Sequence, residues 1–383
     1  MPGLSLSRLL YYKMGINRLV TFGLYIFLSV VIIAAGFSFF SYATNRPPVE
    51  EIGNAREALA SAKGKQAGKY ASERLKDAES FFEQTLQEWK KQNSFFFLFR
   101  DYSHTTELAL KSYNHSLTAF DEANESFNKL KSNAEVRLNR LQRKIDNFEK
   151  YYKNLDLNNS TMKLYNKGRT SFTEAQIEYN SSDYHKSLKL FLQAEESLSQ
   201  AEKQAHIKLA GFYKKYPEWE KNVKTAYNIS KKGQTVFLID KLEASLIVLK
   251  SGKEHRTIPV EFGDNWMSDK IMAGDMATPE GIYKVQAKKG LTKTRFYKAL
   301  LLDYPNNDDR KKYQQMVHSG KIPKNKSIGG LIEIHGEGGK GIHWTEGCVA
   351  LDNNAMDYVF NQSNINTPVI IVGARQSLEE YLN

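Results

Sequence analysis

Hydrophobic and polar residues follow different patterns in three successive parts of the chain, and the first part is almost purely apolar. Its apolar run covers residues 19–42, within a stretch of 27 residues, 19–45, that holds no charged side chain. About 20 apolar residues in a helix are enough to cross the hydrocarbon core of a bilayer. The pattern therefore predicts a transmembrane anchor at residues 19–42.

The charges beside this run predict its orientation. Arg8, Lys13 and Arg18 precede it, and no acidic residue does. Positively charged flanks stay in the cytoplasm, so residues 1–18 are expected to be a cytoplasmic tail and the rest of the chain to lie outside. A cleaved signal peptide is the alternative, because Ser41-Tyr42-Ala43 has small residues at suitable spacing. The apolar part of a signal peptide is only about 7–15 residues long, however.

The second part, residues 47–231, has the periodicity of long amphipathic helices. Between residues 50 and 230 the only proline is Pro217. Apolar residues recur three and four positions apart, which places them on one helical face. We predict an all-α stem of helices packed as hairpins. The clearest stripes are Ala71, Leu75, Ala78, Phe82, Leu86 and Trp89, and then Leu188, Phe191, Leu192, Leu198 and Ala201 with Glu195 as a polar interruption.

A weak internal repeat with an offset of 82 residues runs through this stem. In both copies one helix precedes an Asp-Tyr pair and another follows it. The arrangement resembles the helix pairs of tetratricopeptide repeats, without their signature tryptophan and glycine. The matching residues are Asp101-Tyr102 with Asp183-Tyr184, Leu108 with Leu190, Ala119 with Ala201, and Ala123 with Ala205.

Two features of the stem have more than one interpretation. The run Phe95-Phe96-Phe97-Leu98-Phe99 lies between two predicted helices. It forms either a buried corner or, because exposed apolar patches are costly, a contact with a partner or the membrane surface. The Lys/Arg excess of the stem is either a solvated face or a surface that lies along anionic lipid or an anionic wall polymer.

The third part begins near Gly233, where β-branched and apolar residues replace the helical spacing. Short strands with few helices predict a compact mixed sheet or barrel at residues 233–374, followed by a C-terminal tail at 375–383. A helix is expected at 352–361, with Asn353 and Asn354 near its start as candidate caps. The predicted strands are 235–240, 245–249, 255–262, 281–286, 298–302, 331–335 and 368–372, with a hairpin turn at 251–253. The whole chain is expected to be an α+β multidomain protein.

Composition is that of a folded protein, since 41% of the residues are hydrophobic and 25% are charged. The net charge is +11, but residues 233–383 hold 19 Lys/Arg against 18 Asp/Glu. A nucleic-acid enzyme would place its positive surplus beside its chemistry, so nucleic acid is not expected as a partner. The single cysteine excludes an intramolecular disulfide framework and cysteine-rich zinc modules.

The chemistry is expected in the window LIEIHGEGGKGIHWTEGCVAL, residues 331–351, which holds the only cysteine, Cys348, and two histidines, His335 and His343. A thiol becomes a good nucleophile when a histidine takes its proton and stabilises the thiolate. Such a thiol is expected to react with small electrophiles faster than a free thiol near neutral pH. Gly347 lets the backbone approach closely, so its N–H and that of Cys348 are candidate donors to an oxyanion.

Two other interpretations of the window stay open. Cys348 before Val-Ala-Leu is a small buried hydrophobe in the first. In the second, His335, His343 and Cys348 bind a metal with Glu346 or Glu333, although the spacing matches no common zinc pattern.

The window resembles the active-site signature of the YkuD-type L,D-transpeptidases. That family has His-Gly at a strand end, a Gly-bearing loop, and Ser/Thr-x-Gly-Cys before an apolar residue. Here these are His335-Gly336 and Thr345-Glu346-Gly347-Cys348-Val349. Outlying segments agree in order: a hairpin at 236–249, Thr278-Pro279-Glu280-Gly281, and Tyr304-Pro305-Asn306. The likeness covers residues 233–373 and does not reach the stem.

The resemblance implies acyl transfer through a thioester, with no metal or organic cofactor. Cys348 would attack the carbonyl of an L-centre in a peptidoglycan stem peptide. His335, oriented by the Gly336 carbonyl, would act as general base and then acid. The substrate pocket would be shaped by Thr345, His343, Trp344 and Tyr304. The expected location is the bacterial inner (cytoplasmic) membrane, single-pass, with the bulk of the chain on the periplasmic or wall side. Wall-synthesis proteins are candidate partners of the stem.

The window departs from the family pattern at two side chains. Glu346 stands where the family usually has histidine, and Ala350 where arginine or asparagine often follows the nucleophile. The loop from His335 to Cys348 is also a few residues shorter. The acceptor therefore stays open between an amine, which gives cross-linking or attachment, and water, which gives an L,D-carboxypeptidase. A non-catalytic envelope scaffold that works through the stem is the hypothesis of another class.

Overall fold

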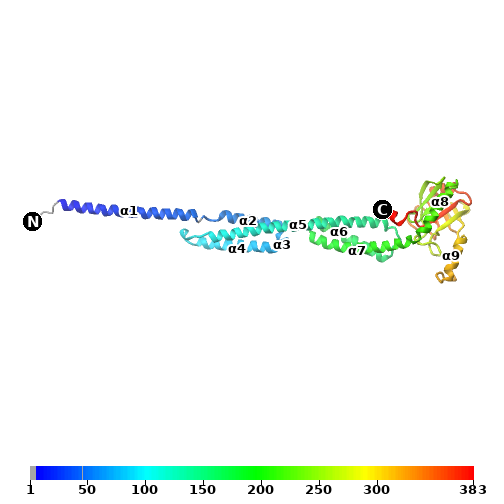
Figure 1. The fold of residues 1–383 in the computed structure, drawn as a ribbon, viewed down its shortest axis with the longest axis horizontal. Helices are drawn as coiled ribbons and strands as arrows, with labels where there is room; N and C mark the ends of the chain where they lie inside the picture. The colour runs from blue at the N-terminus through cyan, green and yellow to red at the C-terminus, as the bar shows by residue number, and fades with distance from the viewer. Residues whose placement is uncertain (1–5, 45) are drawn as a thin grey trace. The chain divides into compact units, whose positions relative to one another are not determined.

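The computed structural model of the chain describes residues 6–44 and 46–383. One long apolar helix comes first, a series of helices follows, and the strands come last (Figure 1). This order confirms the α+β architecture expected from the hydrophobic pattern. The chain divides into two compact units, Met1–Glu135 and Val136–Asn383, and their boundary falls within a single helix, α5 (Ser103–Tyr151).

The first helix, α1 (Leu6–Thr44), contains the predicted anchor. Its segment Val20–Phe40 is long and apolar enough to cross a membrane, and none of that segment is buried against the rest of the protein. It is the single candidate span in the described part of the chain. Residues 1–5 of the predicted cytoplasmic tail lie outside the described residues.

Helices α2 (Val49–Gly64), α3 (Ala67–Tyr70) and α4 (Ser72–Ser94) form the core of the first unit with the beginning of α5. Small side chains let the helix backbones approach closely, so this core is mostly alanine. It comprises Leu59, Ala62, Ala67, Ala71, Leu75, Ala78, Ala119 and Ala123.

A short helical turn, η1 (Phe97–Phe99), joins α4 to α5. Phe97 and Phe99 of this turn are exposed, as are Phe95 and Phe96 before it, while Leu98 is half-buried. The interpretation of this run as a buried corner is therefore wrong.

In the second unit, α6 (Asn159–Asn180) and α7 (Tyr184–Phe212) pack along each other beside the end of α5. Glu195, the predicted polar interruption on α7, accepts hydrogen bonds from Arg137 at 2.9 Å and Arg140 at 2.6 Å, both on α5. Leu192 is exposed, so the predicted stripe is wrong at that position. The buried face of α7 instead runs through Phe191, Ala194 and Leu198, and Leu192 lies outside that face.

The repeated Asp-Tyr pairs both lie at helix starts, with a shift of one residue, because α7 begins at Tyr184 itself and α5 begins at Ser103, directly after Tyr102. Asp101 accepts a hydrogen bond from the backbone N–H of Ser103, where α5 begins. Asp183 accepts one from the backbone N–H of Lys186, in the first turn of α7. Short acidic side chains at these positions satisfy free helical N–H groups.

The C-terminal domain follows η2 (Tyr213–Lys215) and α8 (Tyr216–Lys231) and is built on an eight-stranded mixed sheet. The sheet order is β3-β2-β1-β8-β4-β5-β6-β7. The pairs β1–β8 and β6–β7 are parallel, and the others are antiparallel. The strands are β1 (Val236–Asp240), β2 (Ser245–Lys250), β3 (Lys253–Pro259), β4 (Gly281–Lys289), β5 (Ala299–Leu302), β6 (Glu333–His335), β7 (Val349–Ala350) and β8 (Pro368–Val372).

The predicted strands are confirmed, and three elements were not foreseen. They are β7 and the helices α9 (Asn307–His318) and α11 (Leu378–Tyr381). The expected helix at 352–361 is α10 (Asn353–Gln362). Its cap is the side chain of Asp352, which accepts from the N–H of Ala355, and not either asparagine.

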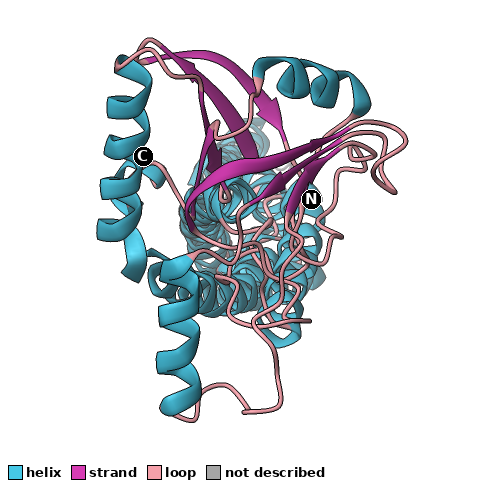
Figure 2. Cartoon of the chain, turned by 90° about the vertical axis from the view of Figure 1, so that its right-hand side faces the viewer, coloured by secondary structure: helices cyan, strands magenta, loops and turns pink. Residues whose placement is uncertain are grey.

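The sheet curls until its two ends meet (Figure 2). Just after β3, Glu261 exchanges two backbone hydrogen bonds of 2.9 Å with Ala350 in β7. Since β3 and β7 stand at opposite ends of the strand order, this bridge closes the curl. The sequence window that was expected to carry the chemistry lies at this closure.

Helix α8 is fastened to the sheet domain by Trp219. The indole is buried over Gly373, where a side-chain Cβ would lie 2.2 Å from a Trp219 ring carbon, so only glycine fits. The indole N–H donates to Glu280 at 2.9 Å. Lys241, also fully buried, donates to the other oxygen of Glu280 at 2.9 Å. Helix α8 and the sheet therefore share one buried core.

Candidate active site

His335 is the last residue of β6, a strand that is paired on both sides. Its Nδ1–H donates to the backbone carbonyl of Gly336 at 2.6 Å. Its ring stacks on Phe296, with centroids 3.6 Å apart and planes within 10°. The bond to Gly336 assigns the proton to Nδ1 and leaves Nε2 as the acceptor. The buried imidazole is thus held in one orientation and one tautomer.

Cys348 comes directly before β7, and the strand register places it relative to His335. In the parallel pair β6–β7, His335 lies opposite Ala350, and Ile334 lies opposite Val349. Cys348 is therefore two positions from the partner of His335, and residues two apart on a strand point to the same face. The two side chains are therefore diagonal neighbours on one face of the sheet. The thiol itself points to the carbonyl oxygen of Leu331, at 3.7 Å.

Burial sets the resting protonation of the pair. It raises the pKa of the Cys348 thiol above its ordinary value, against the opposing effects of the Glu333 backbone N–H and the charge of Arg295. Burial also lowers the pKa of His335, although the bond to Gly336 acts the other way. Low-dielectric surroundings disfavour both charged forms. Both shifts favour the uncharged forms of the two groups, the thiol of Cys348 and the neutral imidazole of His335.

The turn before Cys348 is shaped by Gly347 and Thr345. Gly347 has φ +122°, and a Cβ there would lie 2.5 Å from the carbonyl oxygen of Ala277. The Thr345 hydroxyl donates to the Cys348 carbonyl at 2.7 Å and accepts the Gly347 N–H at 3.2 Å. Of the two candidate oxyanion donors, the Gly347 N–H thus already has a partner. Thr345 orders this turn from within the protein, because its side chain is buried.

Glu261 holds the loop between His335 and Cys348, and sequence reasoning missed it. Its carboxylate accepts the backbone N–H of Gly341 at 2.6 Å and the indole N–H of Trp344 at 2.7 Å. The Trp344 ring stands edge-on to His335, with centroids 6.1 Å apart. The available signal was a lone acid between the apolar residues Val260 and Phe262, a pattern that marks a buried charge with partners.

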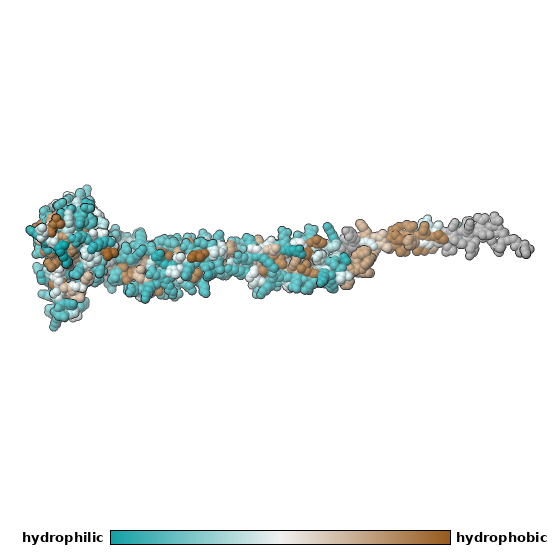
Figure 3. Space-filling model, turned by 180° about the vertical axis from the view of Figure 1, so that it is seen from behind, coloured by the Kyte–Doolittle hydropathy of each residue, from teal (hydrophilic) through white to brown (hydrophobic). Residues whose placement is uncertain are grey.

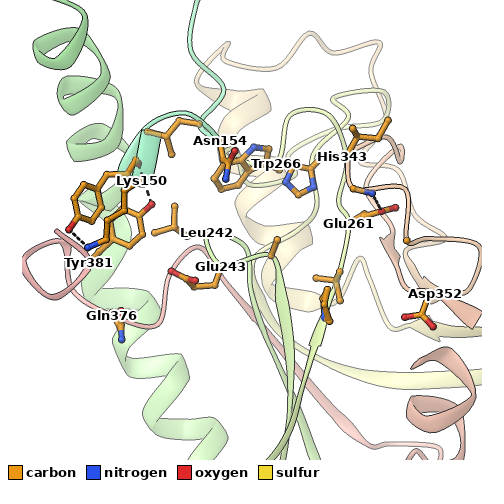
Figure 4. Close-up of a pocket in the computed structure, with 18 residues that line it drawn as sticks. Lys150, Asn154, Leu242, Glu243, Glu261, Trp266, His343, Asp352, Gln376 and Tyr381 are labelled. Carbon is orange, nitrogen blue, oxygen red and sulfur yellow. Dashed lines mark hydrogen bonds between the residues drawn. The ribbon is translucent and has the colours of Figure 1, made fainter. Parts of the chain in front are cut away.

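His343 and Tyr304 have partners other than His335 and Cys348. His343 Nδ1 accepts the backbone N–H of Phe262 at 3.1 Å, and Figure 4 shows its ring beside that of Trp266. It lines a cavity of about 890 Å³ together with Glu261 and Trp266. Tyr304 is buried, and its hydroxyl donates to the Ile328 carbonyl at 3.3 Å. Their roles in substrate binding stay predictions.

Comparison with known proteins bears on the sheet domain alone. Residues 234–371 match the family model of the L,D-transpeptidase catalytic domain, YkuD, which confirms the resemblance seen in the motif. No curated protein sequence matches the chain at a significant level.

Several solved structures are similar to part of the chain. The helical cell shape determining protein Pgp2 from Campylobacter jejuni is 24% identical, with a TM-score of 0.30, over 38% of this chain and 49% of that one. An L,D-transpeptidase from Xylanimonas cellulosilytica is 17% identical, with a TM-score of 0.25, over 37% and 61%. An L,D-transpeptidase from Mycobacterium smegmatis is 14% identical, with a TM-score of 0.24, over 36% and 58%. The chain thus spans only about half to three fifths of these structures. Residues 234–371 form a domain of the YkuD L,D-transpeptidase catalytic family.

Proposed function

We propose that this chain is a cysteine-dependent L,D-transpeptidase that acts on peptidoglycan stem peptides and is held at the outer side of the bacterial inner membrane by α1. One observation carries the proposal. Within a YkuD domain, the strand register puts Cys348 on the same sheet face as a histidine whose tautomer is set by the Gly336 carbonyl.

The first half-reaction uses the neutral pair as it stands. His335 Nε2 takes the thiol proton while Sγ attacks the carbonyl carbon of the L-centre, so that an S–C bond forms and the carbonyl oxygen becomes an oxyanion. The Cys348 N–H is the candidate donor to that oxyanion. The imidazolium then gives its proton to the nitrogen of the D-residue, the C–N bond breaks, and a thioester remains.

The second half-reaction restores the thiol. An amine or a water molecule attacks the thioester carbonyl while His335 takes a proton from it. The S–C bond breaks, and the proton returns to the sulfur. A raised thiol pKa suits this scheme, because the sulfur is reprotonated at the end of each cycle.

The test uses the full chain in detergent with purified muropeptides and mass spectrometry of the products. The expected result is loss of the D-residue with a new amide in its place, and an acyl adduct on Cys348 in the intact protein. The Cys348→Ala variant should give neither product while its circular dichroism spectrum is unchanged. Continued turnover by this variant would refute the proposal.

The same measurement separates the alternatives. A peptide that has lost its D-residue and ends in a free carboxylate points to an L,D-carboxypeptidase, since water rather than an amine has then attacked the thioester. If the wild-type chain yields no product and no adduct, the scaffold hypothesis replaces the enzyme.

A further inference from the structure

An apolar turn protrudes between α4 and α5. Phe95 is 45% exposed, Phe96 61%, Phe97 57% and Phe99 77%. The rings contact one another, with centroids 4.6 Å apart for Phe96–Phe97 and 6.3 Å for Phe96–Phe99. A cluster of exposed aromatic side chains is unfavourable in water and marks a contact site. We call residues 95–99 the Phe turn.

The Phe turn lies beside the end of the candidate membrane span. Residues of η1 lie within 8 Å of α1, Cα to Cα, and both elements belong to the same compact unit. Figure 1 shows the turn between α4 and α5 next to the C-terminal end of α1. The apolar span ends at Phe40. A bilayer that covers the span therefore has its outer interface at the height of the Phe turn.

The flanks of the Phe turn are ordered and basic. Arg100 folds back and donates to the carbonyls of Phe95 at 3.0 Å and Asn93 at 3.1 Å, which closes the turn. Lys90, Lys91 and Arg100 supply three basic groups against two acids, since Glu88 pairs with Lys91 at 3.1 Å and Asp101 follows Arg100, so the flanks keep a small positive excess. Phe and Leu side chains with nearby basic groups are typical of segments that lie in a membrane interface, where the apolar side chains enter the boundary between headgroups and acyl chains and the cations meet anionic lipid.

We infer that the Phe turn inserts into the outer interface of the same bilayer that α1 spans. Its occupant is lipid. Figure 3 shows brown apolar surface along α1 and further brown surface next to its end, and the turn would extend the apolar surface of the span. The inference rests on the proposed anchor and adds a second membrane contact, which would limit how freely the α4–α5 hairpin can pivot about the end of α1.

The experiment places a probe beside the turn without removing a phenylalanine. In the full chain, Cys348→Ser removes the native thiol, and Ser94→Cys, an exposed site, takes an environment-sensitive fluorophore. The chain is reconstituted into vesicles of phosphatidylcholine and phosphatidylglycerol that contain a lipid spin-labelled near the headgroup. We expect quenching several-fold above that of a matched probe at Ile177→Cys, an exposed site on α6.

Two triple variants test the side chains themselves. Phe96→Ser, Phe97→Ser and Phe99→Ser together should reduce the quenching at position 94 to the level of the α6 probe. The control replaces three equally exposed apolar residues of other helices, Val136→Ser, Ile177→Ser and Ile207→Ser, and should leave the quenching unchanged.

The outcomes separate failure of the inference from failure of the anchor. If the chain stays with the vesicles at alkaline pH but the probe at 94 is not quenched, the inference is overturned and the anchor stands. If the chain is extracted at alkaline pH, both are overturned. A fluorescence change that grows with the protein-to-lipid ratio, without quenching by lipid, would assign the turn to a second copy and also overturn the inference.

Discussion

The helical region and the sheet domain bury their side chains in different ways. The core shared by α2–α5 is mostly alanine, and polar contacts there include exposed ion pairs such as Lys111–Glu107. In the sheet domain β1 is wholly buried, and so is Lys241, which pairs with Glu280. An exposed ion pair contributes about 0–1 kcal/mol, whereas breaking a buried pair costs about 3–5 kcal/mol. Substitution of a charged residue should therefore cost less stability in the helical region than in the sheet domain.

The difference extends to how far apart in sequence the contacting residues lie. Neighbouring helices in hairpins such as α6–α7 pack along each other from the turn that joins them, so contacting residues such as Thr161 and Gln204 are at most a few tens of positions apart. The site in the sheet domain joins segments far apart, because Glu261 supports the loop that ends at Cys348. Function that depends on such placement should be sensitive in the sheet domain and insensitive in the helices. The following experiments test that contrast.

The largest difference is expected between two histidines. His335→Ala should lower turnover of muropeptides by about 10²–10⁴-fold, since a general base contributes that much. His206→Ala, on α7 and hydrogen-bonded to Tyr152, should leave turnover unchanged. Product formation measured by mass spectrometry decides the matter. Equal losses in the two variants would contradict the placement of the chemistry.

Two tryptophans offer the corresponding contrast in stability. Trp219→Ala empties a fully buried site over Gly373 and should cost about 3–5 kcal/mol. Trp89→Ala, at a partly buried site in α4, should cost about 1 kcal/mol. Denaturant unfolding followed by circular dichroism measures both. A smaller loss at Trp219 than at Trp89 would reverse the comparison.

Glu261→Gln should lower kcat by about 10–100-fold, because a small displacement of the loop misplaces the reacting groups. KM should change less, and the circular dichroism spectrum should be retained. Glu379→Gln, in the short helix α11, is the matched control and should be silent. An unchanged kcat in Glu261→Gln would show that the Glu261 carboxylate is not needed to position the loop.

The pH dependence of turnover follows from the direction of the His335 shift. Burial lowers the pKa of His335 below its ordinary 6.5, so the imidazole remains an unprotonated base down to a lower pH. Turnover should therefore be retained at pH 6.5 and fall only as the pH drops through the lowered pKa. An acid limb centred above 6.5 would show that the ring is not buried in the working enzyme.

Arg295 should give the smallest effect, because an exposed charge contributes about 0.2–1 kcal/mol. Its charge lowers the pKa of both Cys348 and His335. Arg295→Gln should raise both, so that alkylation of the thiol near neutral pH slows a few-fold and the acid limb of turnover moves up. Arg295→Lys keeps the charge and should restore both. Alkylation rates that are the same in all three proteins would exclude this influence.

The elements that the pattern missed share a physical cause. Helix α9 has no buried residue, so it has no apolar stripe to detect. Strand β7 is two residues long and exists because both β6 and Glu261 pair with it. Asp352 caps α10 because the helix begins at Asn353, so both asparagines lie inside its first turn and the residue before them takes the cap position. The exposure of the Phe turn likewise could not be predicted, because it depends on whether another segment of the chain packs over these rings.

Local order along the chain was enough to locate the apolar span, the helices, most of the strands and the pair Cys348 and His335, because hydrophobic period and motif spacing are properties of residues near each other in sequence. The register of β6 on β7 decided that these two side chains share a face. Closure of the sheet decided that Glu261 reaches their loop, and burial decided the direction of both pKa shifts, upward for the Cys348 thiol and downward for His335. The β6–β7 register joins strands that are close in sequence, but neither strand names its partner in its own pattern. Closure and burial depend on segments far apart in sequence, and backbone pairing and desolvation arise only once those segments have met.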